Sequence, residues 1–310
     1  MSNSLYLAAL AVAAIDGLDA VGTRPPFTDS DDYVAGGVLG ANGRHWVVKC
    51  PKNSHASTLI EAEAALAPLL LDELRRGNLP FDIVRPAGFA NAATGGRALV
   101  FPEPFGRVLG WDEMSAADAR ELGRTLAAIH ALEPDVIADA GLPVYSAEEW
   151  RARVSAELHD VDAASPLPGI LRRRWDEALE DSRLWQFEGG GVHGENFLWS
   201  SNGIATVVGF GQAKVADPAL DLSPFLSLPE RAYASAIDSY ENTRDLELDD
   251  AMYTRMLLMS ELAIPRWLMH GIRTHNPDVE TEAHGMLDEL ARQIEADPEL
   301  RAGLAWSVTD

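Results

Sequence analysis

Three short stretches of this 310-residue chain hold side chains that can act on a charged ligand. Lys49 closes the run WVVK, Glu195 and Asn196 stand side by side in VHGENF, and two aspartates lie in the stretch 207–222. An ammonium group binds anions, a carboxylate accepts protons, and carboxylate oxygens bind hard cations such as magnesium. The chemistry open to these residues is therefore anion binding, proton transfer and metal binding, provided that the fold brings them together.

Lys49 lies at the end of a predicted strand, and strand geometry decides which neighbour shares its surroundings. Side chains alternate between the two faces of a strand, so Val47 and Lys49 lie on one face. That face offers an apolar surface beside an ammonium group, which suits a ligand with a ring and an anionic tail. The alternative interpretation is a strand-end lysine that extends into solvent.

The elements that would position Lys49 form a small sheet with helices in the first hundred residues. Two apolar runs, Tyr33–Ala41 and Arg44–Lys49, flank Asn42-Gly43. An Asn-Gly pair between such runs is the strongest short-range signal for a β-hairpin. The other elements predicted here are helices over Leu5–Ile15 and Ser57–Arg76 and a strand over Ala98–Phe101.

The rest of the chain is predicted to be mostly helical, apart from a strand-rich patch at 191–210. Pro102 and Pro104, which interrupt regular structure, mark the change. A small sheet followed by a larger helical half predicts an α+β fold with two lobes, residues 1-104 and residues 105-310. The predicted helices are Ala116–Ala131, Ala147–His159 and Gly169–Ser182, with further helices between Pro224 and Leu304.

Composition narrows the range of partners. Acidic residues outnumber basic ones by 48 to 25, giving a formal net charge of −23. This charge repels phosphate backbones and anionic lipid, so neither nucleic acid nor a membrane surface is an expected partner. A polar or cationic small molecule, or a basic face on a protein partner, fits better. The single cysteine, Cys50, forms no internal disulfide, and the apolar stretch Leu5–Ile15 is too short to span a bilayer, so we expect a cytoplasmic protein.

Four segments, in order along the chain, resemble the aminoglycoside and small-molecule phosphotransferase family. RALVFPEPFGRVL (97–109) resembles the strand, hinge and Gly-Arg turn that join the two lobes, and ELGRTLAAIHAL (121–132) resembles a long helix that ends in a Leu-His pair. VHGENFLW (192–199) resembles the catalytic loop and VVGFGQAKVADPALDL (207–222) the metal-binding turn. The resemblance implies a bilobal kinase-like fold and transfer of the terminal phosphoryl group of ATP to a hydroxyl group.

The resemblance also implies a role for each residue of a magnesium-ATP site. Lys49 would bind the phosphates, Val47 would contact the base, and a glutamate of the next helix would orient the lysine. Glu61 and Glu63 are both placed for this, and residues two apart do not share a helix face, so only one can turn inward. Glu63 fits better, because apolar residues follow it at helical spacing.

The catalytic loop departs from the family pattern. Glu195 stands where the family has its catalytic aspartate, and the extra methylene shifts the carboxylate away from a near-attack position. Asn196, the expected metal-binding asparagine, follows Glu195 directly, although kinase loops separate these two residues by about four. Such a loop cannot turn both side chains toward one phosphoryl group. His193 is interpreted as structural, and Asn202 as part of an Asn-Gly turn.

The metal-binding turn and the phosphate-covering loop depart as well. Gly209 replaces the expected metal-binding aspartate, so the principal magnesium ligand is missing. Asp217 is a candidate substitute, although Asp217 and Asp221 match positions that hold the second lobe together in the family. The loop after a first strand near Ala20–Thr23 carries two prolines and three aspartates, where a phosphate cradle needs glycines and free N–H groups.

A late helix offers a further polar site. Glu261, Arg266, His270 and Arg273 fall near one face, in the region that lines the acceptor pocket of relatives. A polar-ligand site there is a hypothesis. The tryptophans in helical patterns are interpreted as core residues, namely Trp175, Trp185 and Trp267.

Three functions remain open. The first is a catalytically degraded, pseudokinase-like member of the family with weak or absent Mg-ATP binding. The second is an active ATP-dependent kinase that phosphorylates a hydroxyl of an amino-sugar or another polar metabolite, with ATP and magnesium as cofactors. It would use Glu195 as the base and a relocated metal ligand such as Asp217 or Asp221. The third is an interaction protein whose cleft is filled by its own side chains, with Phe27, Trp46 or Phe210 as the plug.

Overall fold

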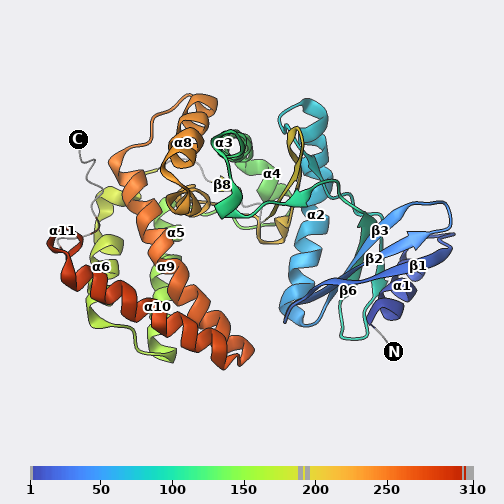
Figure 1. Cartoon of the computed structure of the whole chain (residues 1–310), viewed down its shortest axis with the longest axis horizontal. Coiled ribbons are helices and arrows are strands. Elements are labelled where there is room, and N and C mark those ends of the chain that lie inside the picture. Colours follow the sequence, from blue (N-terminus) through green and yellow to red (C-terminus); the bar gives the residue numbers. More distant parts are fainter. Residues whose placement is uncertain (1–2, 188–190, 193–195, 302–303, 305–310) are drawn as a thin grey trace. The chain divides into compact units, whose positions relative to one another are not determined.

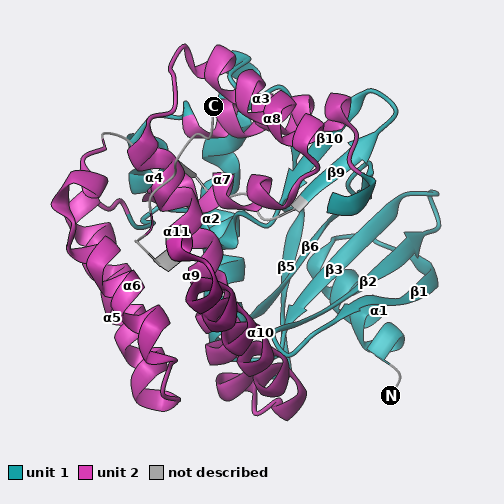
Figure 2. Cartoon of the chain, turned by 60° about the vertical axis from the view of Figure 1, so that its left-hand side comes forward, with its two compact units in different colours: residues 1–113, 131–143, 192–214 teal, residues 114–130, 144–191, 215–310 magenta. Residues whose placement is uncertain are grey.

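The computed structural model describes residues 3–187, 191–192, 196–301 and 304, and the chain divides into two compact units (Figure 2). The first unit consists of residues 1–113, 131–143 and 192–214, and the second of residues 114–130, 144–191 and 215–310. Each unit is assembled from separate stretches of chain. The single lobe boundary between residues 104 and 105 stays a prediction.

The first unit is built around a five-stranded antiparallel sheet in the order β1-β2-β3-β6-β5 (Figure 1). On β3, Trp46, Val48 and Cys50 join an apolar cluster with helix α1, whereas Val47 joins a second cluster with Ile60 of helix α2. The two helices therefore lie on opposite faces of the sheet. The elements are α1 (Asn3–Ala14), β1 (Ala20–Asp29), β2 (Tyr33–Gly40), β3 (His45–Pro51), α2 (Ser54–Arg76), β5 (Gly88–Asn91) and β6 (Arg97–Pro102).

Strand β1 corrects the expectation of a loop after Thr23. The strand continues through Pro25 and Pro26 to Asp29, and its register with β2 shifts around the prolines. Because β1 is at the edge of the sheet, one row of its N–H groups needs no partner, and proline is tolerated there. The connection to β2 is a short hairpin end, where Ser30 N–H donates to the carbonyl of Tyr33 (3.0 Å).

A second, four-stranded sheet in the order β4-β10-β9-β7 also belongs to the first unit. The predicted strand over Gly191–Trp199 is divided, because β8 (Gly191–Val192) and β9 (Asn196–Ser200) are separate elements. After β10, the short helix η3 packs against α2. The remaining elements of this unit are β4 (Asp82–Ile83), β7 (Arg107–Val108), η1 (Trp111–Glu113), α4 (Pro134–Asp139), β10 (Gly203–Val208) and η3 (Phe210–Gln212).

The second unit is helical, and helix α9 is its centre, in contact with α5, α7 and α10. Gly123 lets α3 approach α8, since a Cβ atom there would lie 2.2 Å from the carbonyl oxygen of Ala236. The predicted helices at 116, 147 and 169 begin where expected. The elements are α3 (Ala116–His130), α5 (Ala147–Ala164), α6 (Gly169–Glu180), η2 (Ser182–Trp185), β11 (Val215–Ala216), α7 (Ala219–Leu222), η4 (Ser223–Ser227), α8 (Glu230–Arg244), α9 (Asp250–Thr274), α10 (Pro277–Ala296) and α11 (Pro298–Arg301).

The predicted α+β fold class is confirmed, with sheets in the first unit and helices in the second. Within the described ranges, no helix combines the length and the apolar character needed to cross a membrane.

Candidate functional site

Lys49 and Glu63 form an ion pair on the α2 face of the five-stranded sheet. The distance from Lys49 Nζ to Glu63 Oε2 is 3.0 Å, and the two side chains are 20% and 7% exposed. Strand alternation places Lys49 on the same face as Val47, and α2 turns Glu63 inward because Ile60, Glu63 and Leu66 belong to its buried face. The ammonium group also lies 4.4 Å from the ring centroid of Tyr33. It is held in place while part of it stays open to solvent.

Glu61 turns to a different partner, Arg97 of β6. Arg97 Nε donates to Glu61 Oε1 (2.8 Å), and its terminal nitrogen donates to the other carboxylate oxygen. The hydrogen bond from Arg97 is the main cause that lowers the pKa of Glu61. The guanidinium lies 4.3 Å from the ring centroid of Phe89, so the pair ties α2 to the sheet. Of the two glutamates, Glu63 is the one in contact with Lys49, while its role toward a cofactor stays a prediction.

Val47 is buried on the face that it shares with Lys49. Its side chain is 4% exposed and packs in one cluster with Ile60, Leu99 and Phe101. Contact between Val47 and a base stays a prediction. A base could reach Val47 only if this packing, or the side chains over it, moved.

The proposed apolar plugs lie in three different surroundings. Trp46 belongs to the cluster on the α1 face, opposite Val47 and Lys49, so it cannot fill a site beside them. Phe27 is largely exposed on β1, and Phe210 is buried. Phe210 lies on η3, which packs against α2, so of the three it is the buried residue that is not assigned to the α1 face.

Gly209 begins the turn that the resemblance aligns with the family's metal-binding turn. Its φ of 86° and ψ of 33° are in the left-handed region, which favours glycine. The following residues dock on α2, because a Cβ atom at Gly211 would lie 2.7 Å from the carbonyl oxygen of Leu59. The turn is therefore packed tightly in place, and position 209 offers no side-chain oxygen.

The catalytic-loop predictions fall largely outside the described residues. His193 and Glu195 lie outside them, and of Asn196 the structure describes the backbone, which begins β9 opposite Val208. Asn202 lies between β9 and β10, where its N–H donates to Ser200 Oγ (3.1 Å), in agreement with the predicted turn. The roles of Glu195 and Asn196 stay predictions.

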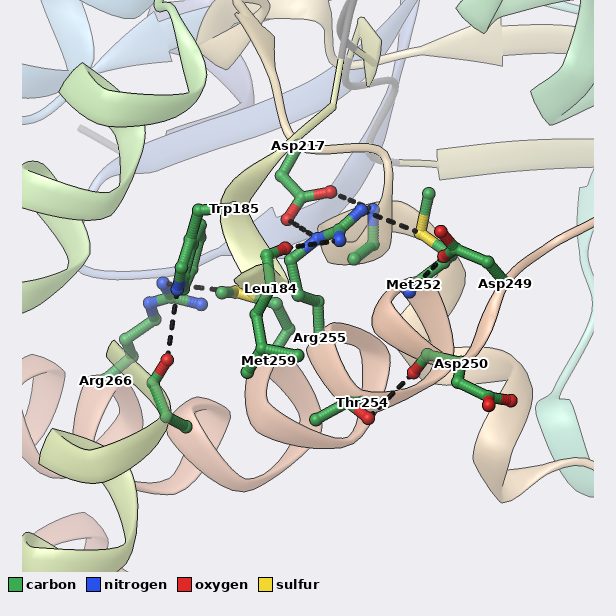
Figure 3. Close-up of polar contacts among 12 residues, drawn as sticks. Leu184, Trp185, Asp217, Asp249, Asp250, Met252, Thr254, Arg255, Met259 and Arg266 are labelled. Atoms are coloured by element: carbon green, nitrogen blue, oxygen red, sulfur yellow. Dashed lines mark hydrogen bonds and ion pairs between the residues drawn. The ribbon is translucent and has the colours of Figure 1, made fainter. Parts of the chain in front are cut away.

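Asp217, the candidate substitute ligand, is committed to contacts within the second unit (Figure 3). Arg255 Nε donates to Oδ2 (2.7 Å), and the N–H of Ala219 donates to Oδ1 (3.0 Å). Arg255 also donates to the carbonyl oxygen of Leu184 (2.6 Å). Burial raises the pKa of Asp217, and the guanidinium opposes that rise. Because both carboxylate oxygens accept hydrogen bonds and the side chain is buried, a metal ion at Asp217 would have to compete with these contacts.

Asp221 takes part in a second buried chain of contacts. His130 Nε2 lies 2.9 Å from Asp221 Oδ2, and His130 Nδ1 lies 2.9 Å from the hydroxyl of Tyr240. These contacts join α3, α7 and α8. The geometry supports the interpretation of Asp217 and Asp221 as residues that hold helices together.

The polar residues of α9 do not converge on one ligand site. Glu261 is buried and accepts hydrogen bonds from Arg174 and from the indole N–H of Trp175 (2.7 Å). Arg266 points to Glu157 instead, at 3.4 Å. His270 stacks on a tryptophan ring, with centroids 5.1 Å apart.

The core interpretation of the three tryptophans needs one correction. Trp175 and Trp185 are buried, as predicted, but Trp267 is 38% exposed. Its indole N–H donates to Glu282 (3.2 Å) and its ring stacks on His270, so surface contacts stabilise it in place of core packing.

The described residues do not fit the magnesium ion that the resemblance implies. Gly209 has no side-chain donor atom, and Asp217 is held by Arg255. Elsewhere in the described part of the chain, no three His, Cys, Asp or Glu side chains come together as a metal site. We therefore derive no catalytic step through a metal ion.

Two partner residues were missed by sequence reasoning. Arg97 and Arg255 are far in sequence from Glu61 and Asp217, so no local pattern joins them. Arg255 did carry a signal, because it stands among the buried apolar positions of α9, and a buried arginine requires a partner carboxylate.

Comparison with known proteins identifies the family. Residues 38–256, more than half of the chain, match the model of the phosphotransferase enzyme family, and the chain belongs to that family. A search of curated proteins gave no match.

Solved structures show the same fold. One is the macrolide 2'-phosphotransferase MphH from Brachybacterium faecium, with 21% identity, a TM-score of 0.71, and coverage of 87% of this chain and 94% of that chain. Another is the GDP and kanamycin complex of APH(2")-IIIa, with 18% identity, a TM-score of 0.74, and coverage of 92% of this chain and 98% of that chain. At such identities the likeness concerns the fold, which is the kinase-like phosphotransferase fold.

Proposed function

We propose that this chain is a phosphotransferase-family protein with the kinase-like fold that has lost magnesium-dependent phosphoryl transfer, with weak or absent Mg-ATP binding. The observation that carries the proposal is Gly209, a residue without a side chain where the resemblance puts the metal-binding aspartate. Its left-handed backbone and the tight docking of Gly211 on α2 leave little room for the turn to rearrange.

The electrostatic consequence is large because a triphosphate concentrates negative charge. In active relatives, metal ions bridge the β- and γ-phosphates and neutralise charge that develops during transfer. Here the whole chain carries a formal charge of −23, which includes Asp29, Asp31 and Asp32 at the β1–β2 hairpin end, where Lys52 pairs with Asp29. A triphosphate without a carboxylate-bound cation would meet repulsion that Lys49 alone cannot offset.

What the chain retains supports binding without catalysis. Lys49 is paired with Glu63 at 3.0 Å and is partly open, so it can still attract a single anionic group. The acidic surface favours a polar or cationic small molecule, and a protein partner with a basic face is compatible with it. Glu195 would supply a base and Asn196 an amide ligand. The loop that carries them is too short to direct both side chains to one phosphoryl group.

A thermal-unfolding titration with ATP tests the proposal. We expect no stabilisation by ATP that depends on magnesium, because ligand stabilisation requires preferential binding to the folded chain. A rise of several degrees in Tm that appears with Mg-ATP and disappears with EDTA would contradict the proposal.

A second candidate function is an active ATP-dependent kinase that phosphorylates a hydroxyl of an amino-sugar or another polar metabolite. The observation that favours it is the intact Lys49–Glu63 pair, the arrangement that active kinases require. The similar structures include a GDP and kanamycin complex, which adds support. Labelled ATP with a panel of amino-sugars, choline-like compounds and sugars tests this candidate, and transfer of label to any acceptor would establish it.

A further inference from the structure

Two adjacent glycines on β2, Gly36 and Gly37, make room on the two faces of the sheet. A Cβ atom at Gly36 would lie 2.8 Å from Leu7 Cδ1 of α1. A Cβ atom at Gly37 would lie 2.7 Å from Nε and 3.1 Å from Cζ of Arg24. The guanidinium of Arg24 therefore lies flat against β2 where a side chain would otherwise stand.

The register of the sheet shows which face Arg24 covers. Gly37 is directly opposite Val47 in the antiparallel pairing of β2 and β3. Directly opposed residues point their side chains to the same face. Val47 belongs to the cluster on the α2 face, so Arg24 covers that face, next to the apolar position assigned to a ring.

The guanidinium is held at its far end by Glu103, in the segment that follows β6. Arg24 donates to Glu103 Oε1, and His45 Nδ1 lies 3.2 Å from Glu103 Oε2. The N–H of Glu103 donates to the carbonyl oxygen of His45 (3.0 Å), and Pro102 and Pro104 restrict the backbone on both sides. The carboxylate is thus presented by a stiff segment, while Arg24 itself is half exposed and free to leave.

We infer that the Arg24–Glu103 ion pair is a latch that closes the α2 face of the sheet above Gly37 and limits the access of a ring-shaped ligand to Val47. When the pair is formed, the guanidinium occupies the surface of β2 beside Val47. When it breaks, the glycine leaves a flat surface on which a planar ring can lie. The inference rests on the kinase-like fold in the proposed function, since Val47 is a ring-contacting position only if the base-binding part of the family's nucleotide site is kept while its metal site is lost.

A latch of this kind has a modest and measurable effect. An exposed ion pair shifts the equilibrium between the closed and open states of the latch toward the closed state by about two- to five-fold. The apparent affinity for a ligand falls by the fraction of molecules in the open state. Removal of Arg24 should therefore tighten the binding of a ring ligand by about two- to five-fold.

Titration calorimetry of the full chain with adenosine, in the absence of magnesium, tests the latch. Adenosine carries the ring without phosphates, so neither the missing metal ligand nor charge repulsion affects the result. We expect Arg24→Ala to bind about two- to five-fold more tightly than the wild-type chain. The charge-exchanged variant, Arg24→Glu with Glu103→Arg, re-forms the pair and should return to the wild-type affinity.

Arg85→Ala is the matched control, because Arg85 forms an ion pair of similar exposure with Asp82 in the same unit. It should bind adenosine as the wild-type chain does. Equal affinities of wild type and Arg24→Ala, or no binding by either, would overturn the inference. If thermal unfolding shows that Arg24→Ala does not fold, Glu103→Gln takes its place with the same expected direction.

The two proposals fail in different experiments. Magnesium-dependent stabilisation of the wild-type chain by ATP would contradict the proposed loss of transfer. It would leave the comparison of adenosine affinities between wild type and Arg24→Ala unaffected.

Discussion

Two ion pairs, Lys49–Glu63 and Asp217–Arg255, come from family motifs but lie in different physical surroundings. The first joins a strand to a helix, and its lysine is 20% exposed. The second is sealed within the helical unit, and both carboxylate oxygens already accept hydrogen bonds. The first can exchange its partner for a ligand, whereas the second cannot do so without leaving a buried charge unpaired.

Under the proposed function, this difference separates what the chain has retained from what it has lost. The ammonium group of Lys49, proposed to bind a phosphate, is in place on the first unit. The resemblance puts the family's metal-binding carboxylate at Gly209, and the nearest acidic residue in sequence, Asp217, holds Arg255 in the second unit. If the proposal holds, a motif residue can be preserved for stability after the chemistry of its neighbours has gone.

The largest expected effect follows from breaking the sealed pair. Arg255→Ala leaves the Asp217 carboxylate buried without its counter-ion and should lower the free energy of unfolding by about 3–5 kcal/mol. Arg273→Ala, on the exposed end of the same helix, should cost less than about 1 kcal/mol. Urea unfolding measures both, and a cost below about 1 kcal/mol for Arg255→Ala would show that the pair is not a structural requirement.

A smaller effect is expected at the open pair. Glu63→Gln removes the charge that faces Lys49 and should cost about 1.5–3 kcal/mol, the range for hydrogen bonds to charged groups. Glu61→Gln, two residues away on the same helix, removes an exposed pair and should cost less than about 1 kcal/mol. The same unfolding experiment ranks them, and the reverse order would show that Arg97, and not Lys49, is the main tie between α2 and the sheet.

Gly209 itself can be tested with two substitutions that both place a Cβ atom at this left-handed position. Gly209→Ala should cost about 1–2 kcal/mol, because φ is 86° and residues with a Cβ atom disfavour that region, and Gly209→Asp should cost less, because aspartate tolerates it better. If the missing carboxylate is what prevents metal binding, Mg-ATP should stabilise the Asp variant and not the Ala variant. Thermal unfolding with and without magnesium distinguishes them, and identical responses would place the defect elsewhere.

The smallest effect is a dependence of stability on pH from Glu61. Its pKa is lowered in the folded chain, mainly by the hydrogen bond from Arg97. A lowered folded-state pKa adds stability above the unfolded value of about 4.3, and that stability is lost as the pH falls through the folded-state pKa. Glu61→Gln should lose less stability than wild type over that acid range. Unfolding curves at a series of acid pH values would show parallel losses if the Arg97 contact does not form in solution.

Strand faces were the most predictable feature of the site. Alternation alone placed Val47 and Lys49 together, and the Asn-Gly turn fixed the β2–β3 hairpin that carries them. Only one of two residues two apart on a helix can face inward, and the apolar residues that follow at helical spacing favoured Glu63 over Glu61. The spacing of side chains along strands and helices, and the residue types in turns, are local properties. A single sequence is therefore enough to determine them.

Long-range pairing was not predictable in the same way. Arg24 reaches Glu103 across the sheet, and Arg97 reaches Glu61 on α2, through contacts that depend on strand order. Strand β1 was predicted too short, because proline usually ends a strand and edge position is not visible in a single sequence. The exposure of Trp267 was missed because a helical apolar pattern does not show that a tryptophan can stay at the surface. Here a contact with Glu282, which is distant in sequence, stabilises it.

A crystal structure of the chain with a non-hydrolysable ATP analogue and manganese tests the central claim most directly, because anomalous scattering locates the metal. The account predicts no manganese ion held by protein oxygens beside residue 209, whether or not the nucleotide is bound near Lys49. An ion coordinated by Asn196, Asp217 or another side chain next to the phosphates would contradict it.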